Sequence, residues 1–377
     1  MTNILELLKN EKVEWKKLGE VCEFNRGKTI TKKSAIEGEI PVIGGGQKPA
    51  YYHNESNREG VTITVAGSGA YAGFVSYWEQ PIFLSDAFSI EPNQKLNKRY
   101  LFHWLLQNQS RIYELKQGSG VPHVYGSDLA KFEIPIPSIE TQEKIVEILD
   151  KLTNYVTELQ SELQSRTKQY TYYRDKLLSE EYLNKITQNK INNFSLKSVA
   201  EYSSKRISAE ELDIFNYVGV DNLLKDKYGR EDSSYVPETG TSTRFEKGDI
   251  LIGNIRPYLR KIWHADRIGG TNGDVLAVSV KSEDIIDSRY LYHVLADEKF
   301  FDYNIKYSKG AKMPRGDKNK IMEYHFPIPP LHVQQHVVSI LDKFDTLVND
   351  IKEGLPKEIE QRQKQYEYWR SVLLTFK

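Results

Sequence analysis

The chain has 377 residues, of which 39% are hydrophobic and 28% charged, enough for two or more domains with their own cores. Its 52 basic and 52 acidic side chains balance, so no overall positive charge points to a nucleic-acid partner. The single cysteine, Cys22, excludes an internal disulfide, and no stretch is apolar enough for a signal peptide or a membrane span, so we expect a cytoplasmic protein.

The first 131 residues predict an α+β domain. Short alternating runs such as "GVTITVAG" at residues 60–67 predict strands, and they are followed by a helix at 99–106 and a loop at 118–124. The stretch "AGSGAYAG" at 66–73 follows a strand, but its glycines lack the spacing of a dinucleotide-binding motif. We therefore interpret it as a turn or a recognition loop.

A long helix is predicted directly after the Pro-Ile-Pro sequence at residues 135–137. Its apolar and aromatic residues recur at alternating steps of four and three, the period of a coiled-coil seam. Residues 157–164 within it read "TELQSELQ", two copies of a four-residue unit. The seam contains Ile145, Leu149, Leu152, Val156, Leu159, Leu163, Arg166, Tyr170, Tyr173 and Leu177, and Arg166 is its one polar member.

Residues 191–325 repeat this order, with a strand run at 248–255, a helix at 289–296 and a loop at 310–316. A second Pro-Ile-Pro at 327–329 opens a second helix, in which Gly354 and Pro356 predict a break and Pro356 opens a new segment. The seam of this helix contains Val337, Leu341, Phe344, Val348, Ile351 and Leu355, then Ile359, Arg362, Tyr366, Trp369, Leu373 and Phe376.

The two helices are copies of each other, whereas the domains between them share almost no identity. Gln142 matches Gln334, and Asp150 matches Asp342 in a repeated Ile-Leu-Asp-Lys. We expect an α+β protein in which two tandem domains are separated by two long helices that form an antiparallel coiled coil, an internal pseudo-two-fold repeat. The alternative is a pair of surface helices that pack on separate domains. The expected segments are domain 1 at 1–135, a helical spacer at 136–185, domain 2 at 186–327 and a second spacer at 328–377.

This tandem resembles the specificity subunit of a type I restriction-modification system. The resemblance rests on the doubled "PIP…Q…ILDK" start and on the doubled "KQY-x-Y-[YW]-R-x-x-LL" end, and it covers essentially the whole chain. It implies two target-recognition domains, each reading one half of a split, asymmetric site in double-stranded DNA. The four-residue units resemble the length adjuster of that family, and each would add about 6 Å of helix, nearly two base-pair steps of roughly 3.4 Å.

The resemblance also implies partner subunits, and it implies that this chain has no catalytic activity of its own. Two methyltransferase subunits would bring S-adenosylmethionine, and two motor-nuclease subunits would bring ATP and Mg. The sequence itself has no phosphate-binding P-loop and no adenine-methylase motif. His332 and His336 lie four residues apart but lack the glutamate of a zinc protease, so we interpret them as surface residues. We expect no catalysis, no cofactor and no metal site on this chain.

Local basic and aromatic clusters are the only indication of DNA contact in the sequence. They lie at residues 26–33, 46–53, 256–261 and 307–320, with a histidine in the late loop of the first domain. Lysine and arginine would hold phosphates, while arginine and glutamine could read base edges. A solvated surface charge is the alternative for each single residue. The candidates are Arg26, Lys28, Lys32, Lys33, Gln47, Lys48, Tyr51, His123, Arg256, Tyr258, Arg260, Lys261, Lys309, Lys312 and Arg315.

Other functions stay open at this point. The same architecture could serve a methylation-only complex, which the sequence does not separate from a restricting one. The balanced charge favours a coiled-coil scaffold whose domains bind proteins. An enzyme is the third alternative and lacks any recognisable active site.

Overall fold

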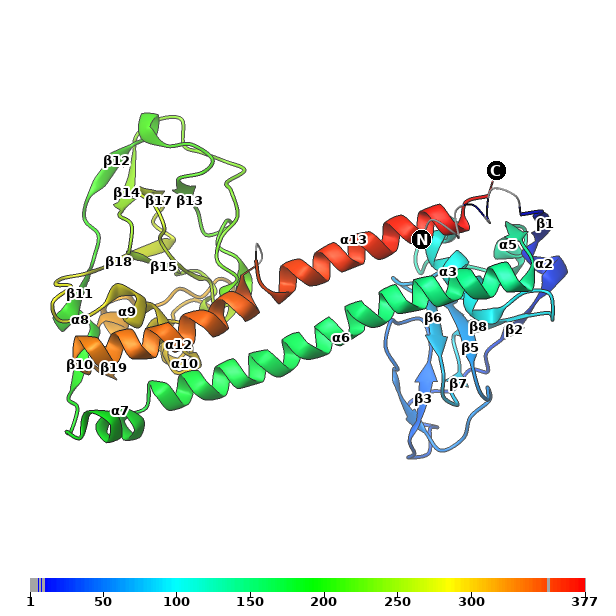
Figure 1. Cartoon of the computed structure of the whole chain (residues 1–377), viewed down its shortest axis with the longest axis horizontal. Coiled ribbons are helices and arrows are strands. Elements are labelled where there is room, and N and C mark those ends of the chain that lie inside the picture. Colours follow the sequence, from blue (N-terminus) through cyan, green and yellow to red (C-terminus); the bar gives the residue numbers. More distant parts are fainter. Residues whose placement is uncertain (1–5, 7, 9–10, 351–352, 377) are drawn as a thin grey trace. The chain divides into compact units, whose positions relative to one another are not determined.

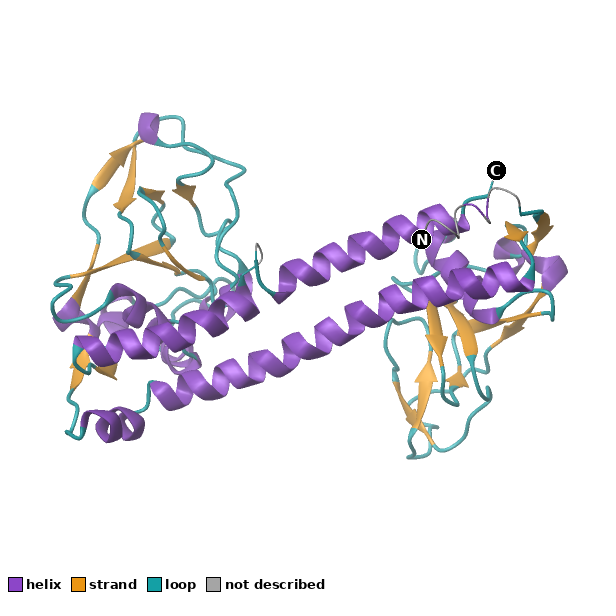
Figure 2. Ribbon diagram, viewed as in Figure 1, coloured by secondary structure: helices purple, strands orange, loops and turns teal. Residues whose placement is uncertain are grey.

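The structure, a computed structural model, describes residues 6, 8, 11–350 and 353–376. The chain divides into two compact units, which we call the first unit (residues 1–157 and 361–377) and the second unit (residues 158–360). Figures 1 and 2 show that each contains strands together with segments of long helix. The domain boundaries expected at 135, 185 and 327 stay a prediction.

The first unit contains a four-stranded antiparallel sheet in the order β2-β8-β5-β6 and a three-stranded sheet in the order β4-β3-β7. A separate antiparallel pair, β1-β9, joins the start of the domain to its end. The elements before the long helix are β1 (Glu14–Lys17), α2 (Leu18–Val21), β2 (Cys22–Arg26), β3 (Ile40–Ile43), β4 (Tyr51–His53), β5 (Thr62–Ala66), β6 (Val75–Trp78), β7 (Phe83–Leu84), β8 (Ala87–Pro92), α3 (Lys98–Gln107), α4 (Gln109–Glu114), α5 (Gly126–Leu129) and β9 (Glu133–Ile136).

The second unit repeats this frame. Its β11-β18-β15-β16 sheet and its β10-β19 pair correspond to the four-stranded sheet and the closing pair of the first unit. The elements are α7 (Glu180–Thr187), β10 (Asn193–Ser195), α8 (Leu196–Val199), β11 (Ala200–Tyr202), β12 (Arg206–Ser208), β13 (Tyr217–Val218), β14 (Thr241–Phe245), β15 (Ile250–Gly253), β16 (Ile262–His264), β17 (Gly269–Thr271), β18 (Val275–Val280), α9 (Ser288–Leu295), α10 (Glu298–Lys306), α11 (Lys318–Met322) and β19 (His325–Pro327), with single 3-10 turns at Ala209–Glu211, Lys225–Lys227 and Pro257–Leu259.

The additional sheet is where the two units differ. In the first unit this sheet has three strands, of which β3 and β7 are parallel. In the second unit it has four strands in the order β12-β14-β17-β13, of which β13 and β17 are parallel. The loops that connect these strands also differ in length and sequence. The repeated part of each unit is therefore a frame, and the variable part is the sheet and the loops built on it.

Three long helices extend the frames: α6 (Ile139–Leu177), α12 (Leu331–Asn349) and α13 (Leu355–Leu374). Within the first unit α6 runs opposite to α13, and within the second unit it runs opposite to α12 (Figure 1). The predicted break of the second helix is confirmed, because α12 ends at Asn349 and Pro356 lies in the first turn of α13. None of the described helices is long and apolar enough to cross a membrane.

The seam residues differ in burial. Leu159, Leu163 and Phe344 are half-buried, and Ile351 lies outside the described residues. The assignment of these residues to the seam stays a prediction. The buried members among the described residues are Ile145, Leu149, Leu152, Val156, Tyr170, Leu177, Val337, Leu341, Val348, Leu355, Tyr366 and Leu373.

A buried glutamine explains the repeated start of the helices. Gln142 is fully buried; its Oε1 accepts from the backbone N–H of Asn97 (2.7 Å), and its Nε2 donates to the carbonyls of Lys95 (3.0 Å) and Pro137 (2.9 Å). The side-chain amide thus ties the first turn of α6 to the N-terminus of α3. Gln334 makes the same three bonds in the second unit, with Asp287, Ile285 and Pro329.

A buried histidine and an aspartate form the next repeated contact. His103 Nε2 lies 2.7 Å from Asp150 Oδ1, and Arg99 Nε donates to the same oxygen at 2.8 Å. Burial raises the pKa of Asp150, but the hydrogen bonds from His103 and Arg99 together bring it below its ordinary value. In the second unit His293 and Arg289 both lie 2.7 Å from Asp342 Oδ1.

The repeated helix ends pack on these same frames. In the first unit the hydroxyl of Tyr366 lies 3.1 Å from His103 Nδ1, and Arg370 donates to Gln107 at 3.0 Å. In the second unit the matching Tyr170 donates to Asp345 at 3.2 Å, and the buried Arg174 donates to the Ala296 carbonyl at 3.1 Å. The helix α6 therefore begins in the first unit and ends in the second, whereas the segment formed by α12 and α13 begins in the second unit and ends in the first.

Candidate nucleic-acid interface

A loop late in each unit packs against the turn that follows a central strand. In the first unit the loop at 117–123 contacts the turn at 67–69, where the N–H of Gly69 donates to the Pro122 carbonyl at 2.9 Å. Ser68 and His123 form an isolated β-bridge, and His123 pairs with Gln117 across the loop. The turn at 67–69 is the glycine-rich stretch interpreted above as a turn or recognition loop.

Two further loops reach the same end of the first unit. Gly27 lies so close to Ser85 that a Cβ at this position would come within 2.1 Å of the Ser85 carbonyl oxygen. A Cβ on Gly45 would come within 2.3 Å of the Ser68 carbonyl oxygen. Only glycine permits these approaches, which hold the loop that carries residues 28–33 against Ser85 and the loop that carries residues 46–48 against Ser68.

A polar hollow of about 560 Å³ lies at this end of the first unit. Arg26 and His123, two of the candidates, line it together with Ser85, Asp86 and Tyr125. The ring of His123 is stacked on that of Tyr125, with 6.1 Å between the ring centres. A hollow with a cation, a carboxylate and stacked rings offers both charge and hydrogen bonds to a polar ligand.

The second unit builds the same arrangement from different residues. The N–H of Arg256 donates to the Pro314 carbonyl at 2.7 Å, and Ile255 and Arg315 form an isolated β-bridge. Arg315 also pairs with Lys309 across the late loop, with 2.8 Å between N and O in both directions. The clusters at 256–261 and 307–320 therefore meet in space.

The structure separates the candidates into two groups. Some have side chains that already bond within their own unit: Tyr51 donates to the Ile30 carbonyl, His123 contacts the Val121 carbonyl, Arg260 pairs with Glu298, Lys261 donates to the Val220 carbonyl, Lys309 pairs with Asp317 and Arg315 pairs with Asp274. The others are exposed and have no side-chain hydrogen bond or ion pair with another described residue: Arg26, Lys28, Lys32, Lys33, Gln47, Lys48, Arg256, Tyr258 and Lys312.

Lys261 illustrates the first group. Burial is the main cause that lowers the pKa of its amine below the ordinary value, and its Nζ donates to the Val220 carbonyl at 2.6 Å. Arg260 lies beside it in a left-handed conformation (φ 50°) and pairs with Glu298 at 2.7 Å. Both side chains brace the loop at 256–261, so Arg256 and Tyr258 are the members of this cluster that face solvent.

Sequence reasoning missed two acidic residues in these clusters. Asp86 directly precedes β8, and Asp274 directly precedes β18. Their carbonyls accept from Gly67 (3.1 Å) and Asn254 (2.8 Å), which shows that the two positions are equivalent. The side chain of Asp86 accepts from the Ser68 hydroxyl, whereas that of Asp274 accepts from Arg315. In the sequence, these two residues are marked only by their position, because each is an aspartate directly before the equivalent strand, β8 or β18.

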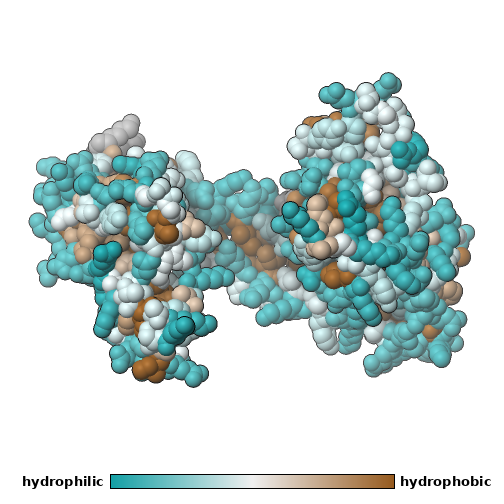
Figure 3. Space-filling model, turned by 180° about the vertical axis from the view of Figure 1, so that it is seen from behind, coloured by the Kyte–Doolittle hydropathy of each residue, from teal (hydrophilic) through white to brown (hydrophobic). Residues whose placement is uncertain are grey.

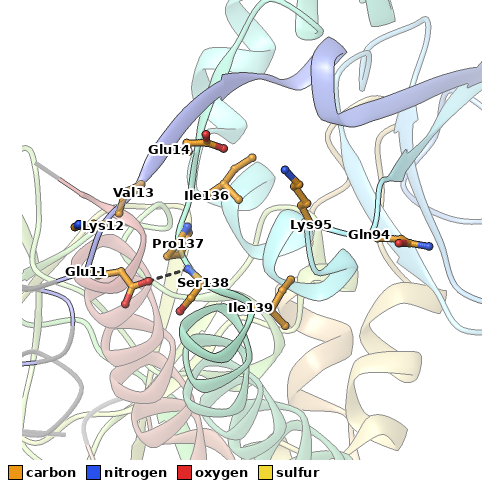
Figure 4. A pocket seen from close by; sticks show the side chains of 10 residues that line it. All are labelled: Glu11, Lys12, Val13, Glu14, Gln94, Lys95, Ile136, Pro137, Ser138 and Ile139. Carbon is orange, nitrogen blue, oxygen red and sulfur yellow. Dashed lines mark hydrogen bonds between the residues drawn. The ribbon is translucent and has the colours of Figure 1, made fainter.

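Another hollow lies at the start of α6, within the first unit, and has a volume of about 560 Å³. Figure 4 shows Glu11 pointing to the N-terminus of this helix, where its carboxylate accepts from the N–H of Ser138 at 2.8 Å. The Thr141 hydroxyl donates to the same carboxylate at 2.8 Å. Glu11 thus caps the helix, and none of the DNA-binding candidates lines this hollow.

The described residues give no sign of a metal centre. No group of three or more His, Cys, Asp or Glu side chains there is arranged to hold a metal ion. The face in Figure 3 is mainly hydrophilic, with separate hydrophobic patches. Cys22 is buried, and burial raises the pKa of its thiol to about 12. The absence of a cofactor and of a metal site stays a prediction.

Comparisons with known proteins agree with this architecture. The family described as "Type I restriction modification DNA specificity domain" matches residues 10–169 and 188–361. A protein of Haemophilus influenzae named as a type I restriction enzyme specificity subunit is 31% identical over 100% of this chain and 98% of its own length. The EcoR124I/EcoR124II specificity subunit of Escherichia coli is 28% identical over 100% of this chain and 97% of its own length.

Solved structures show the same fold. The crystal structure of a type I restriction-modification S subunit from M. genitalium has a TM-score of 0.70 at 19% identity, covering 99% of this chain and 98% of that one. The predicted fold class, two α+β domains with long helices that pair as an antiparallel coiled coil, is confirmed. A chain from a structure on complex assembly of the type I system has a TM-score of 0.50 at 15% identity, covering 96% of this chain and 97% of that one.

Proposed function

Because the chain belongs to the family of type I restriction-modification specificity subunits, which recognise DNA and are not themselves catalytic, we propose that each unit reads one half of a bipartite, asymmetric DNA site. One observation carries this proposal. Both units place a late loop against the turn after the matching strand, β5 or β15, on the same frame, yet the exposed side chains there differ. A common frame with different side chains suits two readers of different sequences.

The proposal assigns the long helices to spacing. α6 runs without interruption from Ile139 to Leu177, and residues 157–164 lie in its middle, where the helix passes from the first unit to the second. These residues are exposed or half-buried. A helix segment with few packing constraints can change length in whole four-residue units, and so set the number of unread base pairs between the half-sites.

We also propose that two identical methyltransferase subunits dock on the chain and that two motor-nuclease subunits complete the assembly. The support is an exposed tyrosine at the same position of each helix end. Tyr172 is 59% exposed and Tyr368 is 63% exposed, and each follows a buried tyrosine, Tyr170 or Tyr366. Identical exposed side chains at matching positions of the two repeated helix ends suit two copies of one partner. S-adenosylmethionine, ATP and Mg would belong to these partners, and a cytoplasmic location stays a prediction.

The function is tested by modified-base sequencing of the host genome with and without this gene. We expect methyladenine in a bipartite motif that disappears when the gene is deleted. The motif would give both half-sites and their spacing in one measurement. If methylation does not change in a host that expresses the partner subunits, DNA recognition by this chain is contradicted.

The partner surface is tested with the double variant Tyr172→Ala and Tyr368→Ala. Because aromatic anchors dominate protein interfaces, we expect about a tenfold or greater loss of affinity for the methyltransferase subunit. The exposed Tyr235→Ala, in a loop of the second unit, is the matched control and should bind normally. Normal binding by the double variant would exclude these tyrosines from the interface.

A further inference from the structure

Arg315 lies in the late loop of the second unit, and the carboxylate of Asp274 holds its guanidinium. Its Nε and Nη2 both donate to Asp274 Oδ1, each at 3.2 Å. The Arg315 side chain is still 53% exposed, and that of Asp274 is 37% exposed. The carboxylate therefore fixes the plane of the guanidinium without covering it.

The backbone on both sides of this pair is fixed as well. Arg315 pairs with Lys309 across a loop that turns at Gly310, where φ is +104° and glycine is favoured. The next residue, Gly316, donates to the Asn254 carbonyl at 3.1 Å, and Asn254 in turn donates to the Asp274 carbonyl at 2.8 Å. Arg315 and Asp274 thus belong to one closed network of hydrogen bonds, so the direction of the guanidinium is set before any ligand binds.

The chemistry of the exposed edge favours one kind of ligand. A guanidinium has five N–H donors, and the carboxylate occupies two of them. The remaining donors on Nη1 and Nη2 form a parallel pair at the exposed end of the side chain. Such a pair matches the O6 and N7 acceptors of guanine in the major groove, and arginine on guanine is the commonest specific contact to a base.

We propose that Arg315, oriented by Asp274, reads a guanine in the half-site of the second unit, which rests on the proposed function of the chain. The first unit lacks this reader. Its equivalent residue is His123, and its equivalent carboxylate, Asp86, accepts from Ser68 instead. The guanine contact therefore belongs to one half-site, and the other half-site is read differently at the matching place.

The test uses the complex of this chain with its methyltransferase subunits. Its binding is measured to DNA duplexes that are randomised across the half-site of the second unit. The wild-type complex should prefer guanine at one position or more. Arg315→Ala should reduce that preference roughly 10- to 100-fold at one position and leave the other positions and the first half-site unchanged. Arg315→Lys should restore only part of the preference, because an ammonium group lacks the rigid, planar pair of donors of a guanidinium.

Three further measurements separate this role from simpler ones. Arg267→Ala removes another carboxylate-paired arginine of the second unit, one that lies outside the late loop, and should leave every preference unchanged. Asp274→Ala should weaken the same position as Arg315→Ala, because it removes the oxygen that holds the guanidinium. The thermal midpoint of Arg315→Ala should stay within a few degrees of wild type, since an exposed ion pair contributes little stability.

Several outcomes would overturn the proposal. The proposal is wrong if the wild-type complex prefers guanine at no position of the half-site of the second unit. It is also wrong if the Arg315→Ala complex keeps every base preference of the wild type. Uniform weakening that Arg315→Lys repairs would make Arg315 a phosphate contact instead. If the wild-type complex shows no sequence preference at all, the proposed function itself fails, and that result is distinct from the others.

Discussion

Two buried glutamines have the same role in both units. The side-chain amides of Gln142 and Gln334 each make three hydrogen bonds with backbone groups, so each satisfies polar atoms that would otherwise be buried without partners. The side chain of glutamine is long enough to reach two carbonyls and one N–H at once. This explains why the residue recurs in a helix start whose neighbours otherwise vary.

Gln142→Ala should lower the free energy of unfolding by about 2–4 kcal/mol, because it removes three hydrogen bonds and leaves the N–H of Asn97 unpaired. Denaturant unfolding of the wild-type chain and the variant measures this loss. Gln160→Ala, at an exposed position of α6, is the matched control and should change the value by less than about 0.5 kcal/mol. A similar small change for Gln142→Ala would exclude the proposed role.

Acidification should destabilise the chain below pH 6.5. Burial is the main cause that holds the pKa of His264 at about 4, and it also lowers the pKa of His103 and His293 from their ordinary value of 6.5. Between pH 6.5 and 4 the unfolded chain therefore binds more protons than the folded chain. The stabilisation that comes from keeping these histidines neutral is fully present above pH 6.5, and it is lost as the pH falls towards 4.

Thermal unfolding across this range tests the histidine contribution. His264→Gln should show a smaller fall between pH 6.5 and 4 than the wild-type chain, because one titrating group is removed. His332→Gln changes an exposed histidine and should leave the profile unaltered. An equal fall in all three proteins would assign the pH dependence to other groups.

The long helix α6 combines two kinds of sequence. Its two ends carry the repeated motifs that pack on frames, while residues 157–164 between them are exposed or half-buried. Packing therefore restrains the ends of the helix more strongly than its middle. A change of length in the middle leaves the contacts at both ends in place.

Deletion of residues 157–160 should shorten the spacer between the half-sites by one or two base pairs, since four residues span about 6 Å of helix. Modified-base sequencing should show both half-sites unchanged. The length-preserving control, Glu158→Ala with Gln160→Ala, changes exposed residues only and should keep the spacing. The same spacing in the deletion variant would contradict the role of α6 as a spacer.

At the scale of the whole molecule, the contacts of each loop cluster come from within one unit. The late loop of the second unit bonds to Asn254 and Asp274 of that unit, and the late loop of the first unit bonds to Gly67 and Gly69. Neither cluster needs residues of the other to keep its conformation. The two units should therefore recognise DNA independently of each other's sequence.

Replacing residues 190–325 with the second domain of another family member should change one half-site and leave the other intact. Gln334 and Asp342 lie outside the exchanged segment, whereas their partners Asp287 and Arg289 lie within it. The donor domain must therefore carry the equivalent partner residues to dock on the same helix. The reciprocal exchange of residues 1–131 is the control and should change the opposite half-site. A change of both half-sites after one exchange would show that the units are coupled.

The sequence by itself determined the elements of this protein that depend on local patterns. The periodic seam predicted long helices, Gly354 and Pro356 predicted the break between α12 and α13, and the repeated motifs predicted two equivalent frames. These features follow from hydrophobic period, backbone restriction and repetition, which are all readable along the chain.

Only the tertiary structure decided which polar residues are available for recognition. Arg260 and Lys261 stand beside Arg256 in one basic cluster, yet their partners, Glu298 and the Val220 carbonyl, come from segments about 40 residues away. Likewise, nothing near Arg315 in the sequence indicates that Asp274 orients it. Hydrogen bonds between distant segments depend on how the chain packs, and a local pattern of charges does not contain that information.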